Sequence, residues 1–181
     1  IPIPRGKLLG GSSSINGLVF VRGQQLDYDT WGQLGNRGWS YDDVLPTFKK
    51  MEHYEHGGDE FRSEGGPLKV SESTDEGPLY EAIRAAAIEL GIPHNSDYNG
   101  VTQEGIVRTQ TTISNGVRMS TARCYLKPIE NRANLRIETN ANVQKVILDG
   151  SRCVGVQYEQ KGKTVQATAA KEVIISTGAV A

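Results

Sequence analysis

Five short segments in the last third of the chain constrain its fold more than any other feature. Each is rich in β-branched or alternating apolar residues, the pattern of strands in a sheet. Turn residues separate them at Asn140, at Asp149–Gly150 and at Lys161–Gly162. The sequence therefore predicts an antiparallel sheet with a hairpin centred on Gly162 and a buried last strand. The predicted strands are residues 135–140, 141–149, 153–160, 164–170 and 172–177.

Helical patterns precede this region. The residues after Leu26 predict two short helices, the first closed by Gly35 and the second opened by Ser40 as N-cap, with Asp43 three residues later. Residues 79–90 combine strong helix formers with apolar residues three and four positions apart, which predicts a third helix. The fold class is therefore expected to be mixed α and β.

The connections between these helices are rich in turn residues. Residues 55–67 contain four glycines and many charges, which predicts a surface loop that acts as a lid or linker. Residues 68–72 follow as a short predicted strand. Residues 105–113 alternate in polarity, and the turn at 114–116 is expected to bend the chain back on itself.

Composition and charge exclude several classes of protein. With 181 residues, 37% hydrophobic and 23% charged, the chain is ordinary for one globular domain or parts of two. Twenty basic and 21 acidic residues give a net charge of -1, too little to hold nucleic acid or an anionic membrane. Small, neutral partners are therefore expected.

The two cysteines and the apolar runs bear on location. Cys124 and Cys153 lack the spacing of a metal site or disulfide framework, which favours a reducing, cytoplasmic location, and Cys124 is expected to be a small buried hydrophobe. No apolar run is long enough to span a bilayer, and the N-terminus does not resemble a signal peptide.

Because Ile1 is not a start methionine and the chain stops after a predicted strand, it is expected to be a piece of a longer protein.

The stretch GKLLGGSSSIN near the N-terminus is the strongest candidate for a binding site. Gly10 and Gly11 lack side chains, so a ligand could reach the main chain, and the following serines could begin a helix whose free N–H groups point at that ligand. The stretch matches neither GxGxxG nor GxxxxGK[ST]. By itself it fits either a cofactor site or a glycine turn before a buried helix.

Four stretches together resemble one family. Residues 6–29 resemble the first signature of the glucose-methanol-choline (GMC) flavoprotein oxidoreductases, which include choline and alcohol dehydrogenases, and every fixed class of that pattern is met. Residues 31–46, 118–126 and 139–146 agree with the family's order, and residues 176–181 resemble the start of its second signature. The resemblance covers the whole chain.

The resemblance implies an enzyme that uses FAD to oxidise an alcohol, with hydride transfer to flavin N5. It implies an α/β FAD-binding piece and an α+β substrate-domain piece with an antiparallel sheet. Residues 1–25 would belong to the FAD-binding segment, 26–130 to the helical connection, lid and part of the substrate domain, and 131–181 to strands that return to the FAD-binding domain.

The resemblance also assigns cofactor-binding residues. Leu8, Gly11 and Ser12 would run beside the pyrophosphate and ribityl chain. The main chain of Val143 would read the adenine edge. Four residues would lie against the isoalloxazine, and two small ones would let a strand end pass near the nucleotide. The first group is Asn16, Gly17, Leu18 and Val19, and the second is Gly178 and Ala179.

The same comparison limits what this chain can do alone. Ile15 stands where some members carry a histidine linked to FAD, so noncovalent FAD is expected. The family's GxGxxG unit precedes this region and its catalytic histidine follows it, so no catalytic residue is predicted here. His53, His56 and His94 match no catalytic position and are predicted to lie at the surface.

Three matters remain open from the sequence. The electron acceptor could be O2 or a quinone, because the residues that decide it lie mostly elsewhere in the family. Some relatives are lyases or light-driven decarboxylases, so the same fold and FAD could serve another reaction. A non-catalytic binding domain is the third alternative. The remaining segments of the parent chain and a small alcohol are the expected partners.

Overall fold

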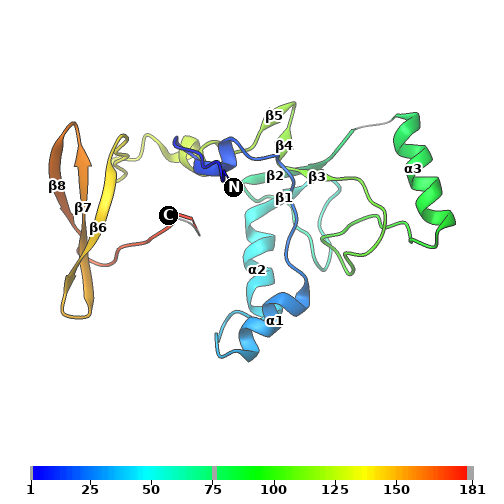
Figure 1. The fold of residues 1–181 in the computed structure, drawn as a ribbon, viewed down its shortest axis with the longest axis horizontal. Helices are drawn as coiled ribbons and strands as arrows, with labels where there is room; N and C mark the ends of the chain where they lie inside the picture. Colours follow the sequence, from blue (N-terminus) through cyan, green and yellow to red (C-terminus); the bar gives the residue numbers. More distant parts are fainter. Residues whose placement is uncertain (1, 75–76, 179–181) are drawn as a thin grey trace. The chain divides into compact units, whose positions relative to one another are not determined.

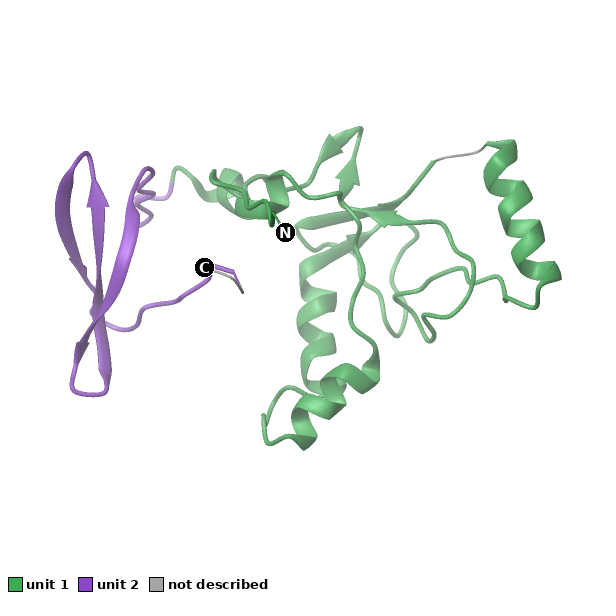
Figure 2. Cartoon of the chain, viewed as in Figure 1, with its two compact units in different colours: residues 1–131 green, residues 132–181 purple. Residues whose placement is uncertain are grey.

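The computed structural model describes residues 2–74 and 77–178. Its contacts divide the chain into two compact units, residues 1–131 and residues 132–181 (Figure 2). Both units contain antiparallel strand pairs, and the first also holds three α-helices (Figure 1). The mixed α and β fold expected from the sequence is therefore confirmed. The roles predicted for residues 1–25, 26–130 and 131–181 stay predictions.

The first two predicted helices are present, and the second has Ser40 as its N-cap, as the sequence predicts. They are α1 (Gln25–Gln33) and α2 (Tyr41–Met51). The backbone N–H of Ser40 donates to Oδ2 of Asp43 at 3.1 Å, as part of a reciprocal capping box that satisfies N–H groups at the start of α2. Gly35 has a φ of 101°, a conformation in which glycine avoids the strain of a Cβ.

Aromatic side chains pack α1 against α2. The ring of Tyr28 meets that of Phe48 edge-on with 5.7 Å between centroids, and it lies 6.2 Å from the ring of Tyr41. The guanidinium of Arg22 lies 5.3 Å from the Phe48 centroid. Aromatic pairs of this kind contribute about 0.5–1.5 kcal/mol each beyond their buried area, so they hold the two short helices together.

A small sheet and a hairpin follow in the first unit. The sheet has the order β1-β2-β3, with β1 parallel to β2 and β2 antiparallel to β3. Strands β4 and β5 form the hairpin, turned by Asn115–Gly116. The predicted strand at 68–72 is confirmed, whereas the one at 105–113 is shorter than expected. The five strands are β1 (Glu52–Tyr54), β2 (Leu68–Glu72), β3 (Gln110–Thr111), β4 (Ile113–Ser114) and β5 (Val117–Arg118).

The loop between β1 and β2 differs from its prediction. Arg62 is only 1% exposed, and its guanidinium lies 3.8 Å from the centre of the Tyr54 ring. Oδ1 of Asp59 accepts the backbone N–H groups of Phe61 and Arg62, each at 2.7 Å, which turns the loop toward the sheet. The prediction of a surface loop over residues 55–67 is therefore wrong at its centre, because the carboxylates of Glu52 and Asp97 compensate the charge of the buried arginine.

The third predicted helix is also present, as α3 (Pro78–Glu89). Proline at its first position costs no hydrogen bond, since that N–H would be unpaired in any helix. Ala87 is 9% exposed, whereas Ile83 is 52% and Leu90 is 81% exposed. Only a narrow face of α3 therefore contacts the rest of its unit. Two short helical turns end the unit: η2 (Ala122–Leu126) and η3 (Lys127–Ile129).

The second unit is an antiparallel sheet of three strands, in the order β6 (Asn142–Asp149), β7 (Arg152–Gln160) and β8 (Lys163–Thr168). The turn between β7 and β8 has two residues with positive φ, Lys161 at 53° and Gly162 at 71°. A two-residue turn with both φ angles positive matches the twist of the paired strands. The hairpin predicted around Gly162 is therefore confirmed.

The strand register sorts the side chains of this sheet by polarity. Residues paired directly across neighbouring strands share one face. Two apolar rows lie on one face, and a polar row lies on the other. The apolar rows are Val143–Tyr158–Val165 and Val146–Val156–Ala167, and the polar row is Lys145–Gln157–Gln166.

Two predicted strands do not form. Residues 135–140 and 172–177 pair with no other strand in the part of the chain that the structure describes. Ile174 and Ile175 are 78% and 65% exposed, so the prediction of a buried strand there is wrong for this chain. Their composition suits a strand, but a strand also needs a neighbour to pair its backbone groups.

Within the described ranges, 2–74 and 77–178, no helix has the length and apolar character needed to cross a membrane. The same residues contain no group of three or more His, Cys, Asp or Glu side chains that could hold a metal ion. Cys124 and Cys153 are both free thiols, and burial raises the pKa of the Cys124 thiol. Cys124 is 5% exposed, as expected for a small buried hydrophobe.

Candidate cofactor site

The glycine–serine stretch forms a tight turn that leads into a single 3₁₀ turn, η1 (Gly11–Ser14). Gly10 and Gly11 have φ angles of 88° and 53°, which residues with a Cβ rarely adopt. Oγ of Ser12 accepts the N–H of Gly6 at 3.2 Å. A Cβ on Gly6 would lie 2.2 Å from the Gly11 carbonyl oxygen, so the fold itself requires glycine there.

The residues just before η2 clamp this turn. The hydroxyl of Ser13 donates to the Gly10 carbonyl oxygen at 2.5 Å and accepts the N–H of Thr121 at 3.0 Å. The Thr121 hydroxyl donates to the same carbonyl at 3.2 Å. A Cβ on Gly10 would lie only 3.2 Å from that of Ala122. Residues 6–29 and 118–126, which both resemble the GMC family and are far apart in the sequence, are therefore in contact here.

Two other glycines of the stretch face open space. A Cβ on Gly11 or Gly17 would meet no described atom within 4 Å, and Gly17 does not have a positive φ. Packing within the described chain therefore gives no reason for glycine at position 17. Large apolar side chains around it are about half exposed: Leu8 55%, Leu9 48%, Ile15 48%, Val19 56% and Val21 59%. Bare backbone beside exposed apolar side chains fits a large, flat ligand.

Within the described part of the chain, Val19 pairs with β3 on one side only. The Leu18 carbonyl accepts the N–H of Thr112 at 2.9 Å, and the N–H of Phe20 donates to the Gln110 carbonyl at 2.9 Å. These two bonds make Val19 the centre of a non-hydrogen-bonded antiparallel pair with Thr111. The N–H and C=O of Val19 therefore point away from β3 and are available to a ligand.

Arg118, at the end of β5, contacts this stretch although no role for it follows from the sequence pattern. Its Nη1 donates to the carbonyl oxygen of Asn16 at 2.8 Å and to the side-chain Oδ1 of Asn16 at 2.7 Å. The Ser13 carbonyl lies 3.2 Å from the same nitrogen. The only indication of a role for Arg118 in the sequence was its position in the RMSTARCYL stretch, which resembles the family.

A buried polar network lies next to the segment that follows Val19. Glu52 accepts hydrogen bonds from Nε and Nη2 of Arg62 at 2.9 and 3.2 Å, and it lies 2.7 Å from Nη2 of Arg22. Nη1 of Arg62 donates to Asp97 at 2.8 Å and to Gln110 at 2.9 Å. Two arginines thus face two carboxylates, and this balance offsets the cost of removing the charges from water.

The network also fixes the backbone after Val19. The Phe20 carbonyl accepts the Tyr98 hydroxyl at 2.8 Å and Nδ2 of Asn99 at 3.1 Å. The backbone N–H of Arg22 donates to Oδ1 of Asn99 at 2.7 Å. The backbone directly after Val19 is therefore held in place by hydrogen bonds from Tyr98 and Asn99.

The pKa shifts in the network indicate a structural role. Burial opposes the charge of Arg62, but the hydrogen bonds and charges of Glu52 and Asp97 outweigh it and raise its pKa. Burial, reinforced by the neighbouring Glu72, raises the pKa of Tyr54 well above its usual value. Both groups keep their protons at neutral pH, so neither is suited to proton transfer there.

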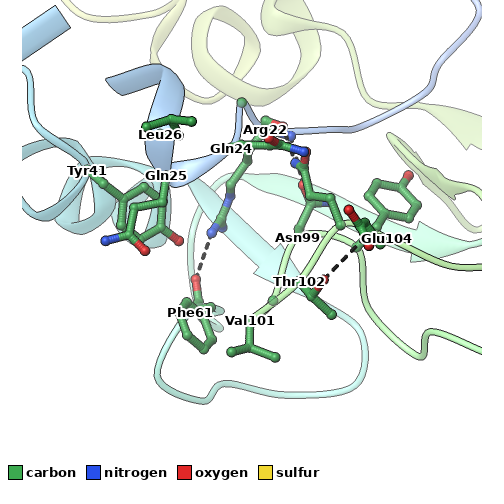
Figure 3. A pocket seen from close by; sticks show the side chains of 14 residues that line it. Arg22, Gln24, Gln25, Leu26, Tyr41, Phe61, Asn99, Val101, Thr102 and Glu104 are labelled. Carbon is green, nitrogen blue, oxygen red and sulfur yellow. Dashed lines mark hydrogen bonds between the residues drawn. The ribbon is translucent and has the colours of Figure 1, made fainter. Parts of the chain in front are cut away.

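A pocket of 270 Å³ opens beside Arg22 (Figure 3). Nη1 of Arg22 donates to the Phe61 carbonyl at 2.7 Å, and Tyr41 and Asn99 also line the pocket. Nε and Nη2 of Arg22 are sealed from solvent and make no well-directed hydrogen bond, although Nη2 is close to Glu52. A solute in this pocket could not reach those two nitrogens, so they cannot bind an anion there.

The predicted site residues fall into two sets. Those from Leu8 to Val19 lie together around the turn in the first unit. Val143 lies in β6 of the second unit and is 53% exposed. Gly178 has a positive φ of 93°, and Ala179 lies outside the described residues.

Two of the three histidines are exposed, as the sequence predicts. His56 and His94 lie at the surface. His53 is half-buried in β1, where its Nδ1 accepts the N–H of Gly65 at 2.9 Å. The prediction of a surface position is therefore only partly correct for His53, because the loop after β1 folds over it.

Comparison with known proteins agrees with this geometry. The profile of the GMC oxidoreductase family matches residues 1–181. The chain belongs to the GMC oxidoreductase family, and its resemblance to this family is thereby confirmed.

Several choline dehydrogenases are similar to this chain. The chain is 43% identical over 179 residues to an oxygen-dependent choline dehydrogenase of Vibrio vulnificus, covering 98% of this chain and 32% of the relative. It is 43% identical over 177 residues to the mitochondrial choline dehydrogenase of Homo sapiens, covering 98% of this chain and 30% of the relative. The chain thus spans about a third of the length of the relatives it matches.

Solved structures of this family have the same fold. Pyridoxine 4-oxidase from Mesorbium loti matches with a TM-score of 0.84 and 30% identity, covering 91% of this chain and 33% of that one. An FAD-dependent oxidoreductase from Chaetomium thermophilum matches with a TM-score of 0.85 and 28% identity, covering 92% of this chain and 32% of that one. A variant formate oxidase of Aspergillus oryzae RIB40, studied for FAD modification, matches with a TM-score of 0.86 and 28% identity, covering 98% and 32%.

Proposed function

We propose that this chain forms one wall of the FAD site in an oxidoreductase that oxidises a small alcohol. The observation that carries the proposal is the open turn around Gly11 and Gly17, where no described atom lies within 4 Å of an added Cβ. Exposed apolar side chains border this bare backbone. A family of oxidoreductases that includes choline dehydrogenases supports the same conclusion.

The residues of the turn would hold two chemically different parts of FAD. Leu8, Gly11 and Ser12 would offer backbone and hydroxyl groups to the pyrophosphate and ribityl chain, since anionic and hydroxylated groups need donors. Residues 16–19 would lie against the isoalloxazine, with the outward N–H and C=O of Val19 beside it. Val143, Gly178 and Ala179 would border the adenine nucleotide. Bound FAD would supply a hydride acceptor at N5 for the alcohol carbon.

FAD is proposed to bind without a covalent link. Residues 8–21 contain no histidine, cysteine or tyrosine, so this stretch has no side chain suited to such a bond. Ile15, which is 48% exposed, is chemically inert at the position where some family members carry a histidine. Acid precipitation should release all the flavin into the supernatant, and flavin that stays with the polypeptide would contradict this point.

The base that takes the alcohol proton is proposed to come from outside residues 1–181. None of the three histidines belongs to the turn, and a positioned histidine is the group most often used for such a transfer. The electron acceptor is proposed to be O2 or a quinone. The free thiols of Cys124 and Cys153 suit a reducing compartment such as the cytoplasm.

Flavin reduction in the full-length protein tests the proposal. The purified protein should show two flavin absorption bands at about one FAD per chain, and anaerobic addition of choline or another small alcohol should bleach them. A colourless protein that takes up no added FAD would refute FAD binding. A protein that holds FAD but is reduced by no alcohol would favour a lyase or photodecarboxylase activity. Comparing reoxidation by O2 and by a quinone then identifies the acceptor.

A further inference from the structure

The side chain of Asn16 is held in one orientation. Its Oδ1 accepts two hydrogen bonds, from Nη1 of Arg118 at 2.7 Å and from the backbone N–H of Leu18 at 3.2 Å. Both partners are donors, so only the oxygen of the amide can occupy this position. Nδ2 has no hydrogen-bond partner among the residues that the structure describes, and the Asn16 side chain is exposed. The amide therefore offers two unused N–H donors.

Arg118 reaches Asn16 through the tertiary fold, because the two residues are far apart in the sequence. It closes the β4–β5 hairpin, pairing across it with Ile113, and lies 102 residues from Asn16 in the chain. The same Nη1 donates to the Asn16 carbonyl at 2.8 Å and lies 3.2 Å from the Ser13 carbonyl. Arg118 thus binds both the backbone at the end of η1 and the amide that follows it.

We propose that Arg118 is a positioning residue, which orients the Asn16 amide so that its NH2 group donates to an acceptor atom of the isoalloxazine. This inference rests on the proposed function and adds a specific hydrogen bond to it. The isoalloxazine edge carries carbonyl oxygens and ring nitrogens that accept hydrogen bonds. An amide turned by 180° would present Oδ1 to these acceptors instead, and two acceptors repel each other.

A double-mutant cycle in the full-length holoprotein tests the coupling. Arg118→Met and Asn16→Leu should each weaken FAD binding about five- to tenfold, the usual effect of losing one hydrogen bond. The double variant should be less than about twofold weaker than either single variant, because both remove the same bond. Arg118→Lys, which keeps one donor, should recover part of the affinity. Arg123→Met, a change at an exposed arginine five positions along the chain, should have no effect.

Asn16→Asp separates this role from simple stabilisation of the turn. The aspartate keeps an oxygen for Arg118 and the Leu18 N–H, so the turn should remain intact, as measured by thermal unfolding. Its second oxygen replaces the NH2 group, so FAD binding should weaken at least tenfold and the visible bands of any bound flavin should shift. If the role were only structural, Asn16→Asp would bind FAD like the wild type.

Either of two results would overturn the inference: additive losses in the double variant, or unchanged FAD affinity and spectrum in both Arg118→Met and Asn16→Asp. These results can be distinguished from a failure of the proposed function. If the proposed function is wrong, the wild-type protein itself binds no FAD. If the wild type binds FAD and is reduced by an alcohol, but positions 16 and 118 are not coupled, only the inference about Arg118 is wrong.

Discussion

Glu52 is the residue on which the buried network depends. It is completely inaccessible, and it forms ion pairs with both Arg62 and Arg22 while accepting the N–H of Ser63 at 3.0 Å. Burial makes these charges interact strongly, but it also makes an unpaired charge very costly. The network therefore tolerates complete replacement better than the loss of one member.

Replacing Glu52 with glutamine tests this dependence. Glu52→Gln keeps the size of the side chain but leaves two buried arginines with one carboxylate, so the free energy of unfolding should fall by about 3–5 kcal/mol. Urea denaturation of the full-length protein measures the loss. Glu60→Gln, at an exposed glutamate two positions before Arg62, should change stability by less than about 0.5 kcal/mol. Equal effects of the two changes would show that the ion pairs contribute nothing specific.

At the scale of elements, the second unit shows how turns and register cooperate. Its hairpin turn places two consecutive residues in the left-handed region, and only the second, Gly162, is a glycine. The turn sets the register, and the register gathers the apolar rows on one face of the sheet. A change in the turn should therefore affect the stability of the β7–β8 pair.

Opposite effects are expected from the two turn positions. Gly162→Ala adds a Cβ at a φ of 71° and should destabilise the protein by about 1–2 kcal/mol. Lys161→Asn should stabilise it by up to about 1 kcal/mol, because asparagine tolerates the left-handed region and Asn-Gly is the preferred pair for such a turn. Hydrogen exchange of the β7 and β8 amides reports both effects. Changes of the same sign at both positions would contradict the turn assignment.

On the scale of the whole molecule, several buried groups favour the protonated state. Burial raises the pKa of the Cys124 thiol and of the Tyr54, Tyr98 and Tyr41 hydroxyls. In the unfolded chain these groups lose their protons near their ordinary values of 9.0 and 10.0. The folded state therefore binds more protons than the unfolded state at alkaline pH, and its stability falls as pH rises.

Urea denaturation at several pH values measures this linkage. Stability should be independent of these groups up to about pH 8 and then decline, by at most about 1.4 kcal/mol per pH unit for each group that holds a proton only when folded. Tyr54→Phe should flatten the decline, because phenylalanine has no proton to lose, although it also removes the hydrogen bond to Glu72. A stability that is constant from pH 8 to pH 11 would disprove the linkage.

The local features of this protein were predictable from its sequence because they depend on neighbouring residues. The capping box of Ser40 and Asp43, the turn at Gly162 and the glycine turn around Gly10 all follow from short-range sterics and hydrogen bonds. The family resemblance also depends on short stretches of sequence, and it drew attention to the residues around the glycine turn as candidates for cofactor binding. The three α-helices and three of the five strands predicted in the last third of the chain were therefore expected correctly.

Only the tertiary structure decided which distant groups meet. Arg62 lies in a polar, glycine-rich loop, and nothing near it in the sequence shows that Glu52 and Asp97 will bury its charge. Arg118 reaches Asn16 only because the β4–β5 hairpin folds back on the glycine turn. Residues 172–177 have the composition of a strand, yet a strand forms only where another strand can pair with its backbone. Local propensity is encoded in short stretches, whereas burial and pairing depend on the whole fold.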